Sequence, residues 1–121
     1  MDLLNYLRND LLHLMRRREK VALRAVRDAI SAIQNAETSY VTSPATIAAP
    51  SDFVAGGVRF GYAERVVREL SAEQMMSLAR GEVDRRLEDA ARLRALGDVD
   101  RALMLKAEAL ALADRLDAYT S

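Results

Sequence analysis

The 121-residue sequence has no cysteine, two prolines, five glycines and only 5% aromatic residues. The lack of cysteine excludes disulfides, thiolate catalysis and cysteine-based metal sites. It fits a reducing compartment, so we expect a cytoplasmic location. No apolar run approaches the roughly 20 residues that span a bilayer. The start of the chain also lacks the basic region and cleavage site of a secretory signal, and we expect no membrane partner.

An excess of charge of one sign is also missing, because 18 Lys and Arg residues balance 18 Asp and Glu residues. Nucleic-acid-binding domains usually have a basic excess, since phosphate neutralisation supplies much of their affinity. The whole chain shows no such excess, although a local basic patch remains open. His13 is the single histidine, and we expect it on the surface. A catalytic triad would need His13 in a cleft with a nucleophile, which nothing nearby in the sequence suggests, and one histidine builds no zinc site without several carboxylates. We therefore predict no catalytic residue, no metal site and no cofactor.

Alanine, leucine and arginine dominate instead, which is typical of an all-α protein. Apolar residues recur at helical spacing in four segments, about 2–17, 19–37, 71–96 and 98–118. The expected apolar faces contain Leu4, Leu7, Leu11 and Leu14 or Met15; Val26, Ala29, Ile30, Ile33 and Ala36; Met76, Ala79, Val83, Leu87 and Ala90; and Leu105, Ala109, Leu112 and Leu116. Glu82 with Arg86 is one of several i,i+4 pairs expected on an exposed face.

Several residues mark the ends of these helices. Ser71 with Gln74 has the spacing of a capping box. Gly97 suits the end of the third helix, and Asp98 can then cap the fourth. Short connections predict that the first two helices pack antiparallel, as do the last two.

Residues 39–68 contain both prolines and three of the glycines, which indicates a long loop with a short helical or extended piece near Arg65–Glu69. The run Gly56–Gly61 is not a phosphate loop, because it lacks the Gly-Lys-Ser/Thr ending and a preceding strand. We therefore predict an all-α fold with one domain over residues 1–121. It would be a small helical bundle of two antiparallel helical hairpins joined by this loop.

The run from Arg16 to Lys20 is the best candidate for a binding surface. Arginines at a helix junction can contact RNA phosphate or an acidic partner. Alternatively, they neutralise the carbonyl end of the first helix. The residues that we single out for nucleic-acid or partner binding are Arg16, Arg17, Arg18, Lys20, Arg24 and Arg27. For Arg27, burial in an ion pair with Glu82 or Glu37 is the alternative.

The order of several motifs resembles the GatB/YqeY family, whose members are related to the tail of the tRNA-dependent amidotransferase B subunit. These motifs are Arg18-Glu19-Lys20, Ala32-Ile33-Gln34-Asn35-Ala36-Glu37, the segment from Leu70-Ser71 to Gly97, and Glu108 in the closing helix. The resemblance covers about residues 3–37 and 69–116, the helical N-terminal part of the family. The family's closing Tyr-Leu-Pro and its C-terminal tail domain, linked with tRNA contact, have no counterpart in the sequence.

The resemblance implies a non-catalytic accessory module that binds tRNA or a tRNA-handling protein such as an amidotransferase. The family is associated with a carbon–nitrogen ligase that uses glutamine as amido-N-donor, so a component of that activity is an alternative. No glutaminase nucleophile is visible, and we do not expect an enzyme acting alone. A protein-interaction or self-association module, including a homo-oligomer, is the other alternative, with apolar faces of the first or fourth helix docking a partner helix.

Overall fold

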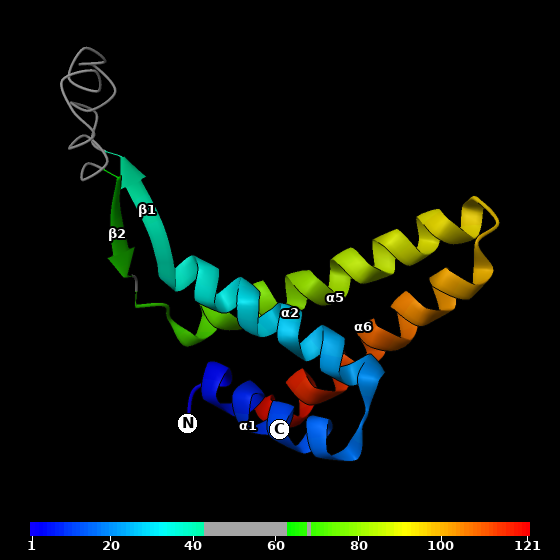
Figure 1. The fold of residues 1–121 in the computed structure, drawn as a ribbon, viewed down its shortest axis with the longest axis horizontal. Coiled ribbons are helices and arrows are strands. Elements are labelled where there is room, and N and C mark those ends of the chain that lie inside the picture. Colours follow the sequence, from blue (N-terminus) through cyan, green and yellow to red (C-terminus); the bar gives the residue numbers. More distant parts are fainter. Residues whose placement is uncertain (43–62, 68) are drawn as a thin grey trace, which may run out of the picture. The chain divides into compact units, whose positions relative to one another are not determined.

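A computed structural model of the protein describes residues 1–42, 63–67 and 69–121 (Figure 1). The chain divides into two compact units, one formed by residues 1–33 with 71–121 and the other by residues 34–70. One domain over residues 1–121 therefore stays a prediction. Within the described residues, none of the helices combines the length and the apolar content that crossing a bilayer requires.

Four helices lie in the described residues, and they confirm the all-α fold class. Their bounds are within two residues of those expected: α1 Leu3–Arg17, α2 Lys20–Glu37, α5 Ala72–Ala95 and α6 Val99–Thr120. In the first unit, α1 and α2 run in opposite directions, and α5 and α6 form a long antiparallel hairpin (Figure 1). The last turn of α2, from residue 34 onward, belongs to the second unit.

Local capping explains where α5 begins and how the chain turns into α6. The Gln74 N–H donates to the Ser71 hydroxyl at 3.1 Å, and the Ser71 N–H donates to the Gln74 side chain at 2.9 Å. The predicted capping box is therefore confirmed. Gly97 has a φ of 89°, in the left-handed region that favours glycine, and the Asp98 side chain caps α6.

The connection between α1 and α2 uses a less common residue. Arg18 has a φ of 58°, and it is the one non-glycine residue with a positive φ in the part of the chain that the structure describes. The Glu19 N–H donates to the Leu14 carbonyl at 3.1 Å, and the Arg18 N–H donates to the Met15 carbonyl at 3.3 Å. This pattern satisfies carbonyls that the end of a helix leaves free, at a conformational cost that glycine would avoid.

Side chains from α1, α2 and α6 fill most of the core of the first unit, and α5 contributes Met75, Ala79, Val83 and Ala90. The largest fully buried side chains are Leu3, Leu7, Leu14, Val26, Ile33, Leu112 and Leu116. Most of these positions are on the apolar faces expected from the sequence. Near the two termini, the Tyr6 and Tyr119 rings lie with their centroids 5.0 Å apart, which joins the start of α1 to the end of α6.

One predicted core position, Leu87, is wrong, because it keeps 39% of its surface exposed. Of the two alternatives at the end of α1, Met15 is 48% exposed. At the end of α1, Leu14 occupies the core position instead of Met15. Leu87 lies in the outer half of α5, where the hairpin extends past α1 and α2 (Figure 1). The apolar periodicity of α5 continues into this outer half, but no helix of the unit covers the apolar face there.

The second unit contains an antiparallel pair of strands, β1 Thr38–Thr42 and β2 Ala63–Val67. The register pairs Thr38 with Val67 at one end and Thr42 with Ala63 at the other. The loop predicted for 39–68 is therefore wrong at its first end, where β1 forms, whereas β2 agrees with the extended alternative predicted near Arg65–Glu69. β-Branched residues in both segments favour extended structure. The run Gly56–Gly61 lies outside the described residues.

Candidate functional site

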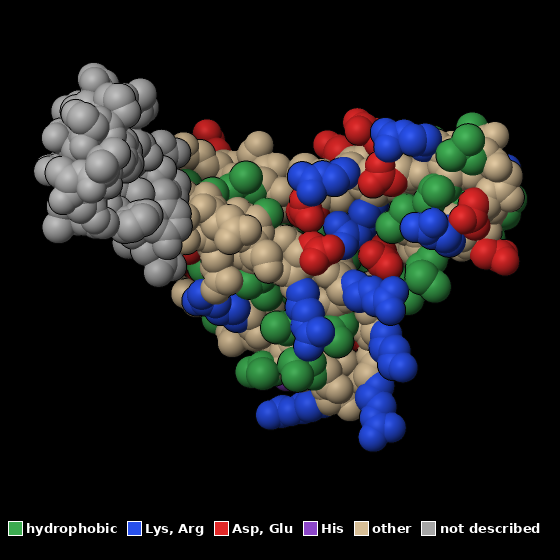
Figure 2. Space-filling view, turned by 45° about the horizontal axis from the view of Figure 1, so that its top comes forward, with side chains coloured by type: hydrophobic (Ala, Val, Ile, Leu, Met, Phe, Trp, Pro, Cys, Tyr) green, Lys and Arg blue, Asp and Glu red, His purple; other side chains and the backbone are tan. Residues whose placement is uncertain are grey.

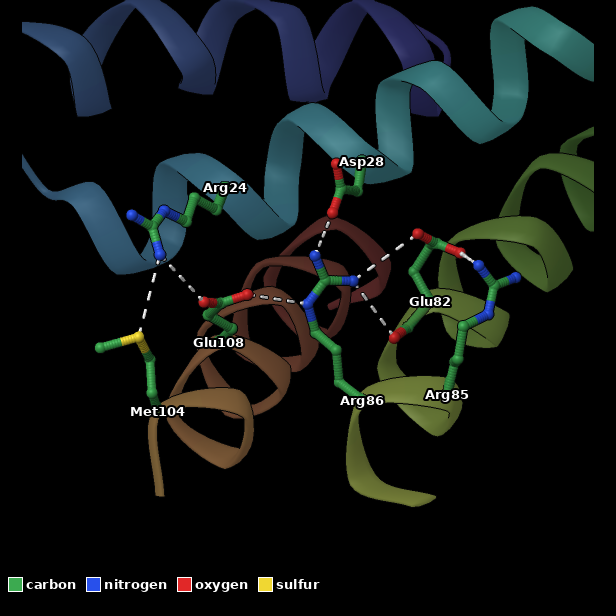
Figure 3. Close-up of polar contacts among 7 residues, drawn as sticks. All are labelled: Arg24, Asp28, Glu82, Arg85, Arg86, Met104 and Glu108. Carbon is green, nitrogen blue, oxygen red and sulfur yellow. Dashed lines mark hydrogen bonds and ion pairs between the residues drawn. The ribbon is translucent and has the colours of Figure 1, made fainter. Parts of the chain in front are cut away.

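A buried cluster of charged side chains lies where α2, α5 and α6 meet (Figure 3). Arg86 of α5 is its centre and is 7% exposed, while Glu82 and Glu108 are 6% and 5% exposed. The Arg86 Nε donates to the Glu108 Oε1 at 3.1 Å, and its Nη1 lies 3.6 Å from the Glu82 Oε1. The Arg86 Nη2 donates to Asp28 of α2. One guanidinium thus connects three helices.

Two exposed arginines complete the cluster on its outer side. The Arg85 Nη1 lies 3.1 Å from the second oxygen of Glu82. The Arg24 Nη1 lies 4.0 Å from the second oxygen of Glu108 and 3.8 Å from the Met104 sulfur. With Arg86 and Asp28 included, the cluster has three arginines and three carboxylates. Its formal charge is therefore balanced, as expected for charges removed from water.

The electrostatic state of Arg86 follows from these contacts. Burial alone lowers the pKa of its guanidinium, because it disfavours the charged form. The hydrogen bonds from Glu108 and Asp28, together with their negative charges, more than offset burial and raise the pKa above its ordinary value. Arg86 therefore keeps its charge, and both buried glutamates stay paired with it.

The chemistry of this cluster is structural. Arginine that stays charged is a poor proton carrier, and no histidine, serine or threonine belongs to the cluster. In the described part of the chain, no group of three or more His, Cys, Asp or Glu side chains is placed to hold a metal ion. The geometry supports a structural lock, by which we mean a group of ion pairs that holds α2, α5 and α6 in position.

The sequence pattern anticipated the Glu82–Arg86 pair but placed it on an exposed face, which is wrong. A signal for burial was present, because Arg86 falls on the same helical stripe as Ala79, Val83 and Ala90. Glu108 has an equivalent place beside Ala109 and one turn before Leu112. Oppositely charged residues on two facing apolar stripes therefore indicate a buried ion pair.

Apart from Arg24, which also belongs to this cluster, the candidate binding residues lie elsewhere, at the α1–α2 connection and along α2. All of them are exposed: Arg16, Arg17, Arg18, Lys20, Arg24 and Arg27. We call the first four, Arg16, Arg17, Arg18 and Lys20, the junction surface. Figure 2 shows Lys and Arg side chains projecting from this lower edge of the molecule, with hydrophobic side chains between them.

The junction surface has little compensating negative charge. Among the described residues, none of its four cations forms an ion pair. Glu19 is the acidic residue within the run, and its carboxylate lies 3.7 Å from the Arg115 Nη2. Arg115 also donates through Nε to Asp10 at 2.6 Å. An arginine of α6 thus partly neutralises Glu19, within the run, and Asp10, earlier on α1.

Arg24 and Arg27 extend this basic character along α2. Lys20, Arg24 and Arg27 follow one another at spacings of four and three, so they share one side of the helix over about 10 Å. Arg27 is exposed, and Glu82 pairs with Arg85 and Arg86. Burial of Arg27 is therefore wrong. His13 is exposed, as expected.

No family model matches the chain, and neither a curated protein nor a solved structure matches it. The resemblance to the GatB/YqeY family therefore rests on the sequence motifs alone.

Proposed function

We propose that the protein is a non-catalytic helical module, related to the tail of the amidotransferase B subunit, that binds tRNA. The contact would be made by the junction surface together with Arg24 and Arg27. One observation carries the proposal: exposed cations gather at the α1–α2 connection, and the acids beside them are paired with Arg115.

Neutralisation of the end of α1 does not account for the whole group. Arg16 and Arg17 lie in the last turn of α1, where they favourably face the partial negative charge of the carbonyls. Lys20 instead lies at the start of α2, whose partial positive charge disfavours a cation. The first turn of α2 has no acidic residue. A cation in this position slightly destabilises the start of α2, and binding of an anionic partner would offset that destabilisation.

The expected contact is with the phosphates rather than the bases. Aromatic side chains that stack on bases give single-stranded RNA sites much of their affinity. In the described part whose side chains are placed, Tyr6 and Tyr119 are the aromatic residues, and they pack on each other. Binding should therefore be electrostatic, strongly dependent on salt and weakly dependent on sequence.

Fluorescence anisotropy with labelled tRNA at about 50 mM and about 200 mM salt tests the proposal. Six phosphate contacts would weaken binding about a thousandfold between these concentrations. Replacing Arg16, Arg17 and Arg18 with alanine removes three cations. We expect the triple variant to bind much more weakly at the lower salt concentration and to lose about half of the salt dependence.

The matched control removes the same amount of charge from the other end of the unit. It replaces Arg92, Arg94 and Arg101 with alanine, all exposed residues of the α5–α6 hairpin. The proposal predicts that this control binds tRNA almost as well as the wild type. Equal losses in the two triple variants would show a net-charge effect and would refute a localised site, as would a lack of binding at low salt.

A component of a glutamine-dependent carbon–nitrogen ligase, a homo-oligomer and a cytoplasmic location remain predictions. The cluster around Arg86 offers no nucleophile for amide transfer, and it favours an accessory role over an enzyme acting alone.

A further inference from the structure

The outer end of the α5–α6 hairpin exposes apolar surface. Helices α5 and α6 have 24 and 22 residues, whereas α1 and α2 have 15 and 18. The hairpin therefore extends beyond the ends of the helices that pack on it (Figure 1). Leu96, Val99 and Leu103 in this part are 77%, 50% and 59% exposed. Exposed apolar side chains in this number at one place are typical of an interaction surface.

Val99 and Leu103 line an open groove of about 340 Å³ between the two helices. Each helix contributes four residues with the spacing i, i+3, i+4, i+7: Leu87, Ala90, Ala91 and Arg94 from α5, and Val99, Ala102, Leu103 and Lys106 from α6. Ala90 and Ala102 are buried, whereas the larger apolar side chains Leu87, Val99 and Leu103 are exposed. A groove of this form accepts the apolar ridge of another helix.

The fourth residue of each set gives the groove a charge. Arg94 and Lys106 are exposed, and neither forms an ion pair among the described residues. Because α5 and α6 are antiparallel, Arg94 lies toward the tip of the hairpin and Lys106 toward its base. Seven residues of helix separate the ends of each set, which is about 10 Å along the axis. The groove thus has a cation at each end, on opposite walls.

The charges argue against a second copy of this chain as the occupant. Outside the groove, Met1, Leu96, Met104 and Leu110 are exposed apolar side chains, and Leu12, Met15 and Val21 form a further exposed group at the α1–α2 connection. This group lies next to the cations of the junction surface, and Figure 2 shows Lys and Arg side chains beside hydrophobic ones there. Bringing that region to the groove would place cations against Arg94 and Lys106, and like charges in an interface are unfavourable.

We propose that this groove is a docking site for an acidic amphipathic helix of a partner protein. The partner helix would place an apolar ridge between Leu87 and Leu103, with carboxylates about two turns apart beside Arg94 and Lys106. The inference goes beyond tRNA binding and uses none of the residues assigned to it. Either function can therefore fail without the other.

The probe is a fluorescein-labelled peptide of about four helical turns. It has leucines at i, i+3, i+4 and i+7, flanking glutamates and a lactam bridge that keeps it helical. A second peptide has lysines in place of the glutamates. Leu103→Glu removes an apolar wall of the groove, and Leu110→Glu is the matched control, because Leu110 is a leucine of α6 that is 51% exposed outside the groove.

We expect the acidic peptide to bind the wild type and Leu110→Glu equally, and to bind Leu103→Glu about tenfold more weakly or worse. Exchanging both cations in Arg94→Glu/Lys106→Glu should reverse the preference, so that the lysine peptide binds better. Circular dichroism of each variant verifies that the helices are retained. Leu103 and Leu110 are both exposed, so we expect both variants to fold, and their affinities for the peptide can be compared.

Three results would overturn the proposal. The first is an absence of acidic-peptide binding, and the second is equal binding of both peptides by the wild type. The third is a dimer in sedimentation velocity that Leu103→Glu abolishes and the acidic peptide does not displace, since the occupant would then be a second copy. Loss of peptide binding in Leu110→Glu as well would also refute the location of the site.

Discussion

Replacing Arg86 with methionine is the sharpest test of how the first unit is held together. Methionine is unbranched, uncharged and reaches as far as the ε position of arginine, so the substitution removes the guanidinium from Glu82, Glu108 and Asp28 while keeping the apolar part of the side chain. Two glutamates that are 6% and 5% exposed would then share a site with no buried cation. Removing one partner of a buried ion pair typically lowers the free energy of unfolding by about 3–5 kcal/mol.

Most of this loss should come from Glu108 and Glu82. The Asp28 side chain is 57% exposed, so water can solvate its carboxylate after the substitution. The nearby Arg24 and Arg85 are 65% and 69% exposed, and they screen the remaining charge only partly. A loss of this size is a large fraction of the stability of a small domain.

Urea unfolding followed by circular dichroism measures the change. The matched control is Arg92→Met on the same helix, because Arg92 is 69% exposed and, within the described ranges, pairs with Asp89 alone. The control should change the free energy of unfolding by less than about 0.5–1 kcal/mol. In a double-mutant cycle with Glu108→Gln, Arg86 and Glu108 should show a coupling of about 0.5–3 kcal/mol.

The pH dependence of the loss in stability provides a second test of the cluster. The folded-state pKa of Arg86 is raised, so its contribution is fully present below the unfolded-state pKa and is lost only as the pH rises through the folded-state value. The loss in Arg86→Met should therefore be the same at about pH 7 and about pH 9. A loss below about 1 kcal/mol, or one no larger than in Arg92→Met, would refute the assignment of the cluster as a structural lock.

Two further predictions concern the ends of helices. Arg18→Gly should raise the free energy of unfolding by about 0.5–1 kcal/mol, because glycine adopts a φ of 58° without strain; unchanged or lower stability in thermal unfolding would contradict it. The same variant should bind tRNA somewhat more weakly, since it lacks one cation. Ser71→Ala should lower stability by about 1 kcal/mol through loss of the capping box, whereas Ser77→Ala, an exposed position within α5, should have little effect.

Much of the fold could be predicted from local patterns. The four helices follow from apolar residues three and four apart, and the turn between α5 and α6 follows from Gly97 and Asp98. Such features depend on residues within one or two turns of each other, so they are readable without knowledge of the tertiary contacts. The exposure of the cations from Arg16 to Lys20 was foreseen for the same reason.

The strands and the ion cluster needed information that no local pattern contains. Thr38–Thr42 and Ala63–Val67 become strands only by pairing with each other across a segment rich in proline and glycine. Arg86 is 22 residues from Glu108 and 58 from Asp28 along the chain. A helical pattern shows that Arg86 shares a stripe with alanines, but not which carboxylates meet it.

By itself, therefore, the sequence determined the class of the fold, the helices with their caps, and the exposed basic run at the α1–α2 connection. Which charges are buried together, which cation neutralises the acids near the junction surface, and where an apolar face stays uncovered depend on the tertiary structure. Leu87 and Val83 have the same periodicity, yet Leu87 is 39% exposed and Val83 is 7% exposed. The difference arises because burial on the hairpin depends on how far α1 and α2 extend along it. That extent is set by the packing of the folded chain, so the periodicity of one helix does not show it.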